Sequence, residues 1–183
     1  MLDRISIRAR LIGLAVILLG ITIGTDLYLT RALDSASAAA VQSDRLVQEI
    51  KHASAVRVAF DDLRYWMTDL AVSLLTQSER NAETARLRLQ ARLEEFTQDE
   101  PELATTIRTE ARAFDDAAGK AVDAYTNDQR VLGNSLFAGA REHGQRVDAL
   151  LDKLDVQLLQ RINASRDRII ARTEATARVA SGV

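Results

Sequence analysis

The sequence predicts an all-α fold, in which an N-terminal transmembrane helix is followed by an up-down-up-down four-helix bundle with two long outer helices. The 183-residue chain is 47% hydrophobic but only 4% aromatic, and it contains a single proline. This composition favours long helices. One apolar run near the N-terminus is long enough to cross a bilayer. The remaining chain repeats apolar residues at heptad spacing, with three short polar interruptions.

The apolar run is the first predicted element. It extends from Leu11 to Leu29, and its only charged residue is Asp26. As an α-helix it would span roughly 28 Å, close to the thickness of the hydrocarbon core of a bilayer. A cleaved signal peptide and a buried soluble helix are the alternatives. The small residues at 36–38 resemble a cleavage site, but charged residues separate them from the run, so we expect a membrane anchor.

Charge sets the expected orientation of this anchor. The run is preceded by three arginines, Arg4, Arg8 and Arg10. Basic flanks stay on the cytoplasmic side of a membrane. Residues 1–10 are therefore expected to be a cytoplasmic basic start, residues 11–29 a transmembrane helix, and residues 30–180 a domain on the opposite side.

Three glycines lie on one face of the predicted anchor. Gly20 and Gly24 form a GxxxG pattern, and Gly13 precedes them by seven residues. Small residues at this spacing let two membrane helices approach closely. We predict that these glycines mediate transmembrane packing.

The first helix of the domain follows a heptad repeat and ends near Thr76. Its a positions are Leu46, Ala53, Phe60, Met67 and Leu74. Its d positions are Glu49, Val56, Leu63 and Leu70, and only the glutamate departs from an apolar seam.

Three further helices are expected, bounded by turn-forming residues. The second spans roughly 79–98 after a capping Ser78, and the third roughly 101–130. A breaker at 133–135 precedes the fourth, over about 136–180. The inward face of the second helix is predicted to be Ala82, Leu89, Leu93 and Phe96. That of the third helix is predicted to be Leu103, Ile107, Ala111, Phe114, Ala118, Val122 and Tyr125. That of the fourth helix is predicted to be Ala140, Gly144, Val147, Leu151, Leu154, Leu158, Ile162, Ser165 and Ile169.

The helix lengths follow the order long, short, medium, long. Short connections make neighbouring helices antiparallel, so the fourth helix should return toward the membrane. We expect residues 181–183 to be the end of a piece that stops before a second transmembrane helix.

This arrangement resembles the periplasmic four-helix-bundle sensor region of bacterial transmembrane chemoreceptors, the methyl-accepting chemotaxis proteins, and of related sensor histidine kinases. The resemblance covers nearly the whole chain and lies in the order and lengths of the helices. The segments RYWMTDLAVSLL (64–75) and DQRVLGNSLFAGAR (128–141) also look like those of alphaproteobacterial receptors of this kind.

The resemblance implies a receptor of the bacterial inner membrane that acts in signal transduction, such as chemotaxis. It implies that the domain after residue 30 lies in the periplasm. The implied partners are a second copy of the chain, and a small-molecule ligand or a periplasmic binding protein.

Two arginines on the first bundle helix are candidate ligand-binding residues. Arg57 and Arg64 lie beside the seam, one heptad apart. The planar fork of a guanidinium suits carboxylates. The alternative is ordinary ion pairing with Asp61, Asp62 or neighbouring helices. The aspartate receptor of the family grips its ligand with a cluster of arginines, and the wider spacing here departs from that pattern, so amino-acid specificity is not implied.

Further candidates lie near these arginines. Tyr65 and Trp66 follow directly in the sequence, although the tryptophan has the alternative role of sealing the edge of the core. Antiparallel alignment of the first and fourth helices brings Arg146 to the same level. Arg141 and His143 join the same zone.

An apolar stripe marks the face opposite the seam of the first helix. It consists of Val58, Tyr65 and Val72, at heptad spacing. Scattered apolar residues are normal on protein surfaces, which is one explanation. The other is a homodimer interface, because a two-fold axis buries the same patch from each chain. We predict the dimer.

Several classes of function find no support in the sequence. The chain has no cysteine and a net charge of −2, which argues against thiolate metal sites and against nucleic-acid binding. His52 and His143 should lie at different levels, so no metal site is expected. Neither a phosphate-binding loop nor a nucleophile or zinc-protease motif is present. We expect a protein that is not an enzyme and has no cofactor.

The function predicted is ligand sensing outside the cytoplasm, with the binding signal passed through long helices across the membrane. The alternative is a membrane-anchored structural spacer or adaptor that binds no small ligand. The two differ in the chain expected after Val183, because a sensor continues into a second apolar run and a cytoplasmic output domain.

Overall fold

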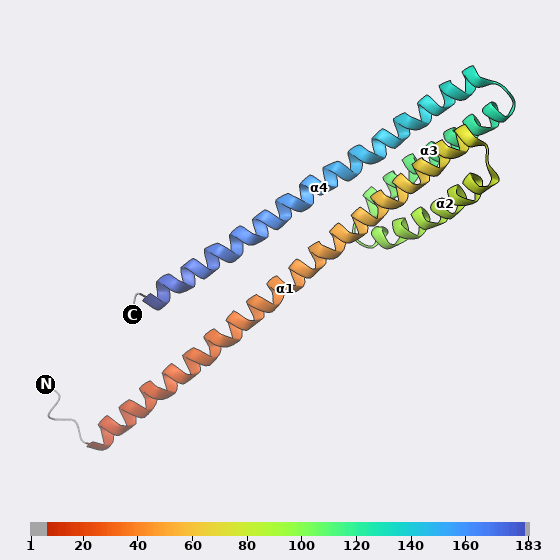
Figure 1. The fold of residues 1–183 in the computed structure, drawn as a ribbon. Helices are drawn as coiled ribbons and strands as arrows, with labels where there is room; N and C mark the ends of the chain where they lie inside the picture. Colours follow the sequence, from red (N-terminus) through yellow and green to blue (C-terminus); the bar gives the residue numbers. More distant parts are fainter. Residues whose placement is uncertain (1–6, 182–183) are drawn as a thin grey trace. The chain divides into compact units, whose positions relative to one another are not determined.

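The computed structural model describes residues 7–181, which form four α-helices (Figure 1). These are α1 (Ile7–Ser73), α2 (Thr76–Thr97), α3 (Pro101–Thr126) and α4 (Arg130–Ser181). Within this described range there is no strand, so the prediction of an all-helical chain is confirmed. The chain divides into two units, Met1–Asp44 and Arg45–Val183, which are described separately below.

The first unit contains the beginning of α1, described from residue 7 to residue 44. Its large apolar side chains are exposed; Leu11 is 62% exposed and Ile17 62%. Within the described residues, one helix is long and apolar enough to cross a membrane, by length and composition alone. A Cβ atom added at Gly13, Gly20 or Gly24 would meet nothing within 4 Å. The face formed by these glycines is therefore open in this unit.

The second unit has one hydrophobic core to which all four helices contribute. The predicted seam of α1 is buried from Leu46 to Met67, with Leu70 packed against the core. Glu49, the one polar residue of the seam, is also buried. The predicted inward residues of α2 are all buried, as are those of α4 from Ala140 to Leu158. The spacing thus identified these buried faces correctly. On α3 it was right for Ile107, Ala111, Phe114 and Ala118, but Leu103, Val122 and Tyr125 are only partly buried. The other buried positions of α3 are Ala104, Ala121 and Ala124, whose small side chains did not stand out in the sequence.

The ion pairs and hydrogen bonds of the second unit show how its helices run. Between α1 and α4, Arg57 pairs with Asp155 and Arg64 with Asp148, so rising residue numbers on one helix meet falling numbers on the other. The same reversal relates α2 to α3, where Arg86 pairs with Asp115 and Arg108 donates to Thr97. It also relates α3 to α4, where Glu110 pairs with Arg146 and Tyr125 donates to Asn134. Neighbouring helices are therefore antiparallel, as Figure 1 shows.

The connection between α1 and α2 is shorter than predicted. Helix α1 ends at Ser73, because Leu74 adopts a left-handed backbone conformation with φ of 52°. Leu74 is 47% exposed, so its predicted seam position is wrong. Helix α2 begins at Thr76, and Ser78 lies inside it rather than capping it. The Ser78 hydroxyl is buried and donates to Asp69 of α1, which joins the two helices across the turn.

The connection between α3 and α4 also differs from the prediction. The break falls at residues 127–129, where Asp128 has a φ of 56° and the Gln129 N–H donates to the Ala124 carbonyl. The predicted breaker at 133–135 lies within the first turns of α4. Asp tolerates the left-handed conformation, and Gly133 serves a packing role instead, described below. At the other end of α4, Ile169 is 49% exposed rather than inward.

Candidate functional site

Arg57 and Arg64 lie between α1 and α4, where both form ion pairs. Arg57 contacts Asp152 at 2.9 Å and Asp155 at 2.8 Å. Partial burial lowers the pKa of Arg57, but the two carboxylates outweigh it, so its pKa is raised. Arg64 donates to Asp148 at 2.8 Å and to Asp61 at 2.5 Å. The two arginines are therefore on one side of α1, and each is compensated by carboxylates.

Arg146 faces a different neighbour. Its Nε donates to Oε2 of Glu110 on α3 at 2.8 Å, and Nδ1 of His143 lies 2.7 Å from the same oxygen. The hydrogen bond from Arg146, and to a smaller extent the contact with His143, lowers the pKa of Glu110. Arg146 thus belongs to the α3–α4 contact, whereas Arg57 and Arg64 belong to the α1–α4 contact.

The depressed pKa of Glu110 predicts part of the acid sensitivity of the second unit. Its stabilising contribution is complete above the ordinary pKa of 4.5 and is lost as pH falls through the lower folded value. We expect Glu110→Gln to flatten the fall in stability with pH below 4.5. The measurement is urea unfolding followed by circular dichroism between pH 6 and pH 3. Glu142→Gln is the control, because this exposed residue on α4 forms no ion pair with the residues that the structure describes. An equal flattening in this variant would contradict the assignment.

Tyr65 and Trp66 lie next to each other but face differently. Their rings are edge-to-face, with centroids 4.9 Å apart and an angle of 81°. Trp66 packs against the core, whereas Tyr65 is 60% exposed. Val58 and Val72 on the same stripe as Tyr65 are 57% and 83% exposed. The three residues of the predicted dimer stripe therefore form an open apolar face of α1.

One pocket of about 560 Å³ lies between α1, α3 and α4. We call it the basic pocket, because Arg64 and Arg141 line it and no aspartate or glutamate does, among the described residues. Its other lining residues are the aromatic Phe114, Tyr125 and Phe137, the polar Thr68 and Asn134, and the small apolar Ala71 and Val72. Of the five ligand-binding residues predicted from the sequence, Arg64 lines this pocket.

The two arginines of the basic pocket differ in their charge balance. Arg64 is held by two aspartates, and its guanidinium carbon lies 5.8 Å from the centroid of the Phe60 ring. Arg141 is exposed and lies over Phe137, one turn earlier on α4, at 5.7 Å. No acidic partner of Arg141 occurs in the described part of the chain. The sequence grouped Arg141 with Arg64 in one candidate zone, and the packing of the helices brings these two arginines and three aromatic rings around one pocket.

Gly133 shapes one wall of the basic pocket. A Cβ atom at this position would lie 2.5 Å from the Tyr125 ring, which is closer than packed atoms approach. The ring therefore packs directly on the α4 backbone, and its hydroxyl donates to Asn134 Oδ1 at 2.9 Å. By contrast, a Cβ atom at Gly144 would meet Phe114 and Phe60 at 3.7 Å, which is ordinary contact.

These glycines predict opposite responses to alanine. Gly133→Ala should lower the free energy of unfolding by about 1–3 kcal/mol, because the Tyr125 ring must shift. Gly144→Ala should raise it by about 0.5–1 kcal/mol, because alanine restricts the unfolded chain and fits the space. Gly139→Ala is the control for helix propensity alone, since a Cβ there meets nothing within 4 Å. Urea unfolding of the three variants tests this, and a stabilising Gly133→Ala would contradict the packing of Tyr125.

A second hollow, of about 360 Å³, lies between α2 and α3. Its lining mixes acids with arginines. Arg86 is bound there by both oxygens of Asp115, at 2.6 and 2.8 Å. That hydrogen bonding raises the pKa of Arg86. This hollow supplies its own counter-charges, so it offers less to a charged ligand than the basic pocket.

The two histidines each pair with one carboxylate. Nδ1 of His52 lies 2.5 Å from Asp99 Oδ2, at the connection between α2 and α3, while His143 pairs with Glu110. The described residues contain no group of three or more side chains able to hold a metal ion. Arginine, aromatic and hydroxyl groups around the basic pocket suit binding of an anion, and no nucleophile–base pair lines it.

Comparison of this chain with models of protein families, with curated proteins and with solved structures found no match. The function proposed below therefore rests on the geometry of the basic pocket.

Proposed function

We propose that this chain is the extracytoplasmic ligand-sensing module of a bacterial transmembrane signal-transduction receptor, such as a chemoreceptor or a sensor histidine kinase. In this proposal residues 11–29 span the inner membrane, and residues 30–180 form an up-down-up-down four-helix bundle in the periplasm. The protein binds a signal molecule and is not an enzyme.

The observation that carries the proposal is the basic pocket and the helices that line it. The pocket has a volume of about 560 Å³, within the range of small-molecule sites. Arg64 comes from α1, which is one helix of 67 residues, and Arg141 from α4, which has 52. A ligand in the pocket would contact both long helices.

The proposed mechanism follows from these contacts. A ligand shifts an equilibrium between two arrangements only by its difference in affinity for them. If the ligand contacts α1 and α4 in one arrangement better than in the other, binding favours one position of α4 along α1. Small shifts of packed helices along one another are one of the ways in which proteins change between two arrangements.

The test of sensing is a thermal-shift screen of the full chain in detergent. The panel contains small carboxylates, amino acids, amines, sugars and phosphates. A sensor predicts that at least one class raises the unfolding temperature in proportion to its concentration. A spacer or adaptor predicts no shift with any class, and that result would overturn the proposal.

We also propose that the receptor is a homodimer through the open stripe of Val58, Tyr65 and Val72. Tyr65→Glu is expected to raise the dimer dissociation constant at least about tenfold, because it buries two carboxylates near the two-fold axis. Analytical ultracentrifugation of the full chain in detergent measures this. Leu87→Glu is the matched control, since Leu87 on α2 is 59% exposed against 60% for Tyr65. Equal association states for both variants would place the interface elsewhere.

A further inference from the structure

We infer that the basic pocket binds a small monocarboxylate with an apolar body, and that Arg141 is the residue that receives the carboxylate. This inference rests on the proposed sensing function and adds to it the class of ligand and the position of the site. The site lies within one chain, between α1, α3 and α4. It differs from the residues singled out in the sequence, because Arg57 and Arg146 do not line the pocket.

The charge balance of the pocket points to one negative charge. Arg64 already donates to Asp61 and Asp148, so its charge is compensated. Arg141 has no ion pair with any residue that the structure describes, and no acid among these residues lines the pocket. The pocket therefore holds one uncompensated cation. A ligand with a single negative charge neutralises it, whereas a dicarboxylate or a phosphate monoester would bring an unpaired second charge.

The geometry of the free cation favours a carboxylate. A guanidinium presents two parallel N–H donors that match the two oxygens of a carboxylate. The Arg141 guanidinium carbon is 5.7 Å from the centroid of the Phe137 ring, which restricts its position over the ring face. A cation restricted in this way loses less conformational freedom when it binds a ligand.

The remaining walls of the pocket require an apolar body. Phe114 is fully buried and Phe137 is 8% exposed, and the small side chain of Ala71 adds to the same lining. At the polar side, the Tyr125 hydroxyl is bound to Asn134 Oδ1 at 2.9 Å. Aromatic and aliphatic walls with a few polar groups are typical of sites that bind small organic molecules.

The inference is tested by isothermal titration calorimetry on the full chain in lipid nanodiscs. The probes are benzoate and cyclohexanecarboxylate, which combine the charge with an apolar body. Benzamide has the apolar ring of benzoate without its negative charge, and acetate has the carboxylate without the large apolar body. Inorganic phosphate is an anion with neither a carboxylate nor an apolar body. We expect the first two probes to bind at least about tenfold more tightly than the other three.

Two variants test the site itself. Arg141→Gln removes the free cation at an exposed helical position, so the fold should be kept. Asn134→Asp adds a negative charge to the pocket, while the new carboxylate can still accept the hydrogen bond from the Tyr125 hydroxyl. Each variant is expected to weaken benzoate binding at least about tenfold.

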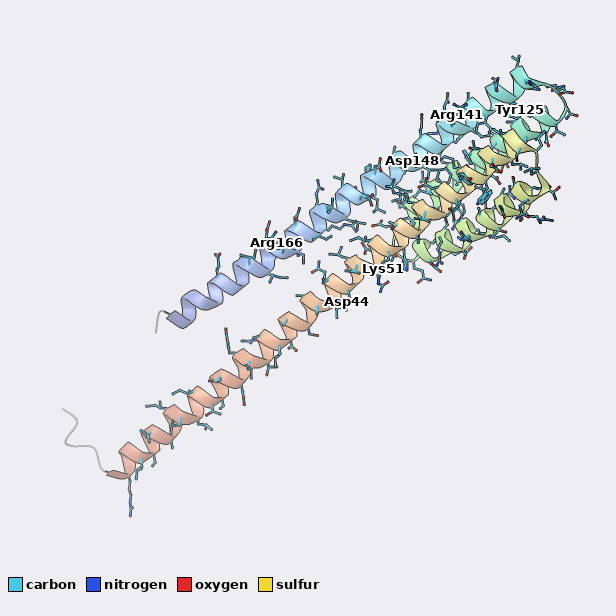
Figure 2. All side chains as sticks on the ribbon, viewed as in Figure 1. Asp44, Lys51, Tyr125, Arg141, Asp148 and Arg166 are labelled. Carbon is cyan, nitrogen blue, oxygen red and sulfur yellow. The ribbon has the colours of Figure 1, made fainter. Side chains whose placement is uncertain are left out.

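Matched controls lie outside the pocket. Arg166→Gln removes an exposed arginine further along α4 (Figure 2). Asn81→Asp makes the same isosteric change on α2, where Asn81 Oδ1 accepts a hydrogen bond from Gln77 at 3.0 Å. Both controls should bind benzoate as the unaltered chain does.

The outcomes separate this inference from the proposed function. Unchanged benzoate binding in both Arg141→Gln and Asn134→Asp would show that the pocket is not the site, although sensing would stand. Benzamide binding as tightly as benzoate, or a thermal shift with another class only, would show that the ligand class is wrong. Absence of binding by every probe and every class in the screen would overturn the inference and the proposed function together.

Discussion

Phe60→Ala is expected to lower the free energy of unfolding of the second unit by about 3–5 kcal/mol. Phe60 is fully buried at the centre of the core. Its ring packs edge-to-face on Phe114, with centroids 5.3 Å apart and an angle of 71°. Three helices meet here, because Gly144 of α4 lies against both rings. Truncation leaves a cavity that rigid helices cannot fully close, and it also removes the aromatic contact.

The measurement is urea unfolding of the full chain in detergent, followed by circular dichroism. Val47→Ala is the control, because it shortens an apolar side chain of the same helix at a position that is 45% exposed and lies outside the proposed dimer stripe. We expect it to cost less than about 1 kcal/mol. Similar losses in the two variants would contradict the assignment of the buried face of α1.

Arg161→Met is expected to lower the free energy of unfolding by about 1–3 kcal/mol, because it removes the partner of a buried carboxylate. Arg161 of α4 donates to Glu49 at 3.2 Å and also contacts Glu100 at 3.2 Å. The Glu49 side chain is only 8% exposed. Arg45, at 3.5 Å from Glu49, is largely exposed and offsets only part of the loss.

The double variant Glu49→Leu/Arg161→Met gives the sharper result. It places an apolar residue at the seam position and removes both charges, so we expect stability equal to or above that of the unaltered chain. Arg88→Met is the control for an exposed pair, since Arg88 contacts Asp62 at 2.7 Å with both side chains more than a third exposed. It should cost at most about 1 kcal/mol. A double variant as unstable as Arg161→Met would show that the seam does not accept leucine at this position.

Glu49 shows what the heptad repeat of α1 could predict and what it could not. The repeat on α1 identified Phe60, Leu63 and Met67 as buried, and it identified Val58 and Tyr65 as exposed. Periodicity can do this because each residue of a helix turns about 100° from the last, so a repeated apolar residue defines one face. It also marked Glu49 as the exception, but the compensating Arg161 lies 112 residues away in the chain. Nothing local in the sequence indicates that partner.

The turns show a different limit. The residues at 133–135 have turn-forming composition, yet they are helical, and the break occurs at Asp128. Gly133 is glycine because the Tyr125 ring lies against its backbone, not because the chain turns there. A glycine can be required by a tight turn or by a closely packed neighbour, and the sequence looks the same in both cases. Only the contact with Tyr125 shows which of the two applies to Gly133.

By itself, the sequence determined that this chain is helical, which residues form most of the buried faces of α1, α2 and α4, and that one N-terminal helix is apolar enough to cross a membrane. The tertiary structure alone decided the electrostatic partners. Arg57 and Arg64 are neutralised by carboxylates of α4, whereas Arg141 meets none in the described residues and lines a pocket with three aromatic rings. Helical periodicity gives the direction of each side chain from its own axis. The charge that a side chain meets depends on the rotation and register of the neighbouring helix, which many distant contacts fix together.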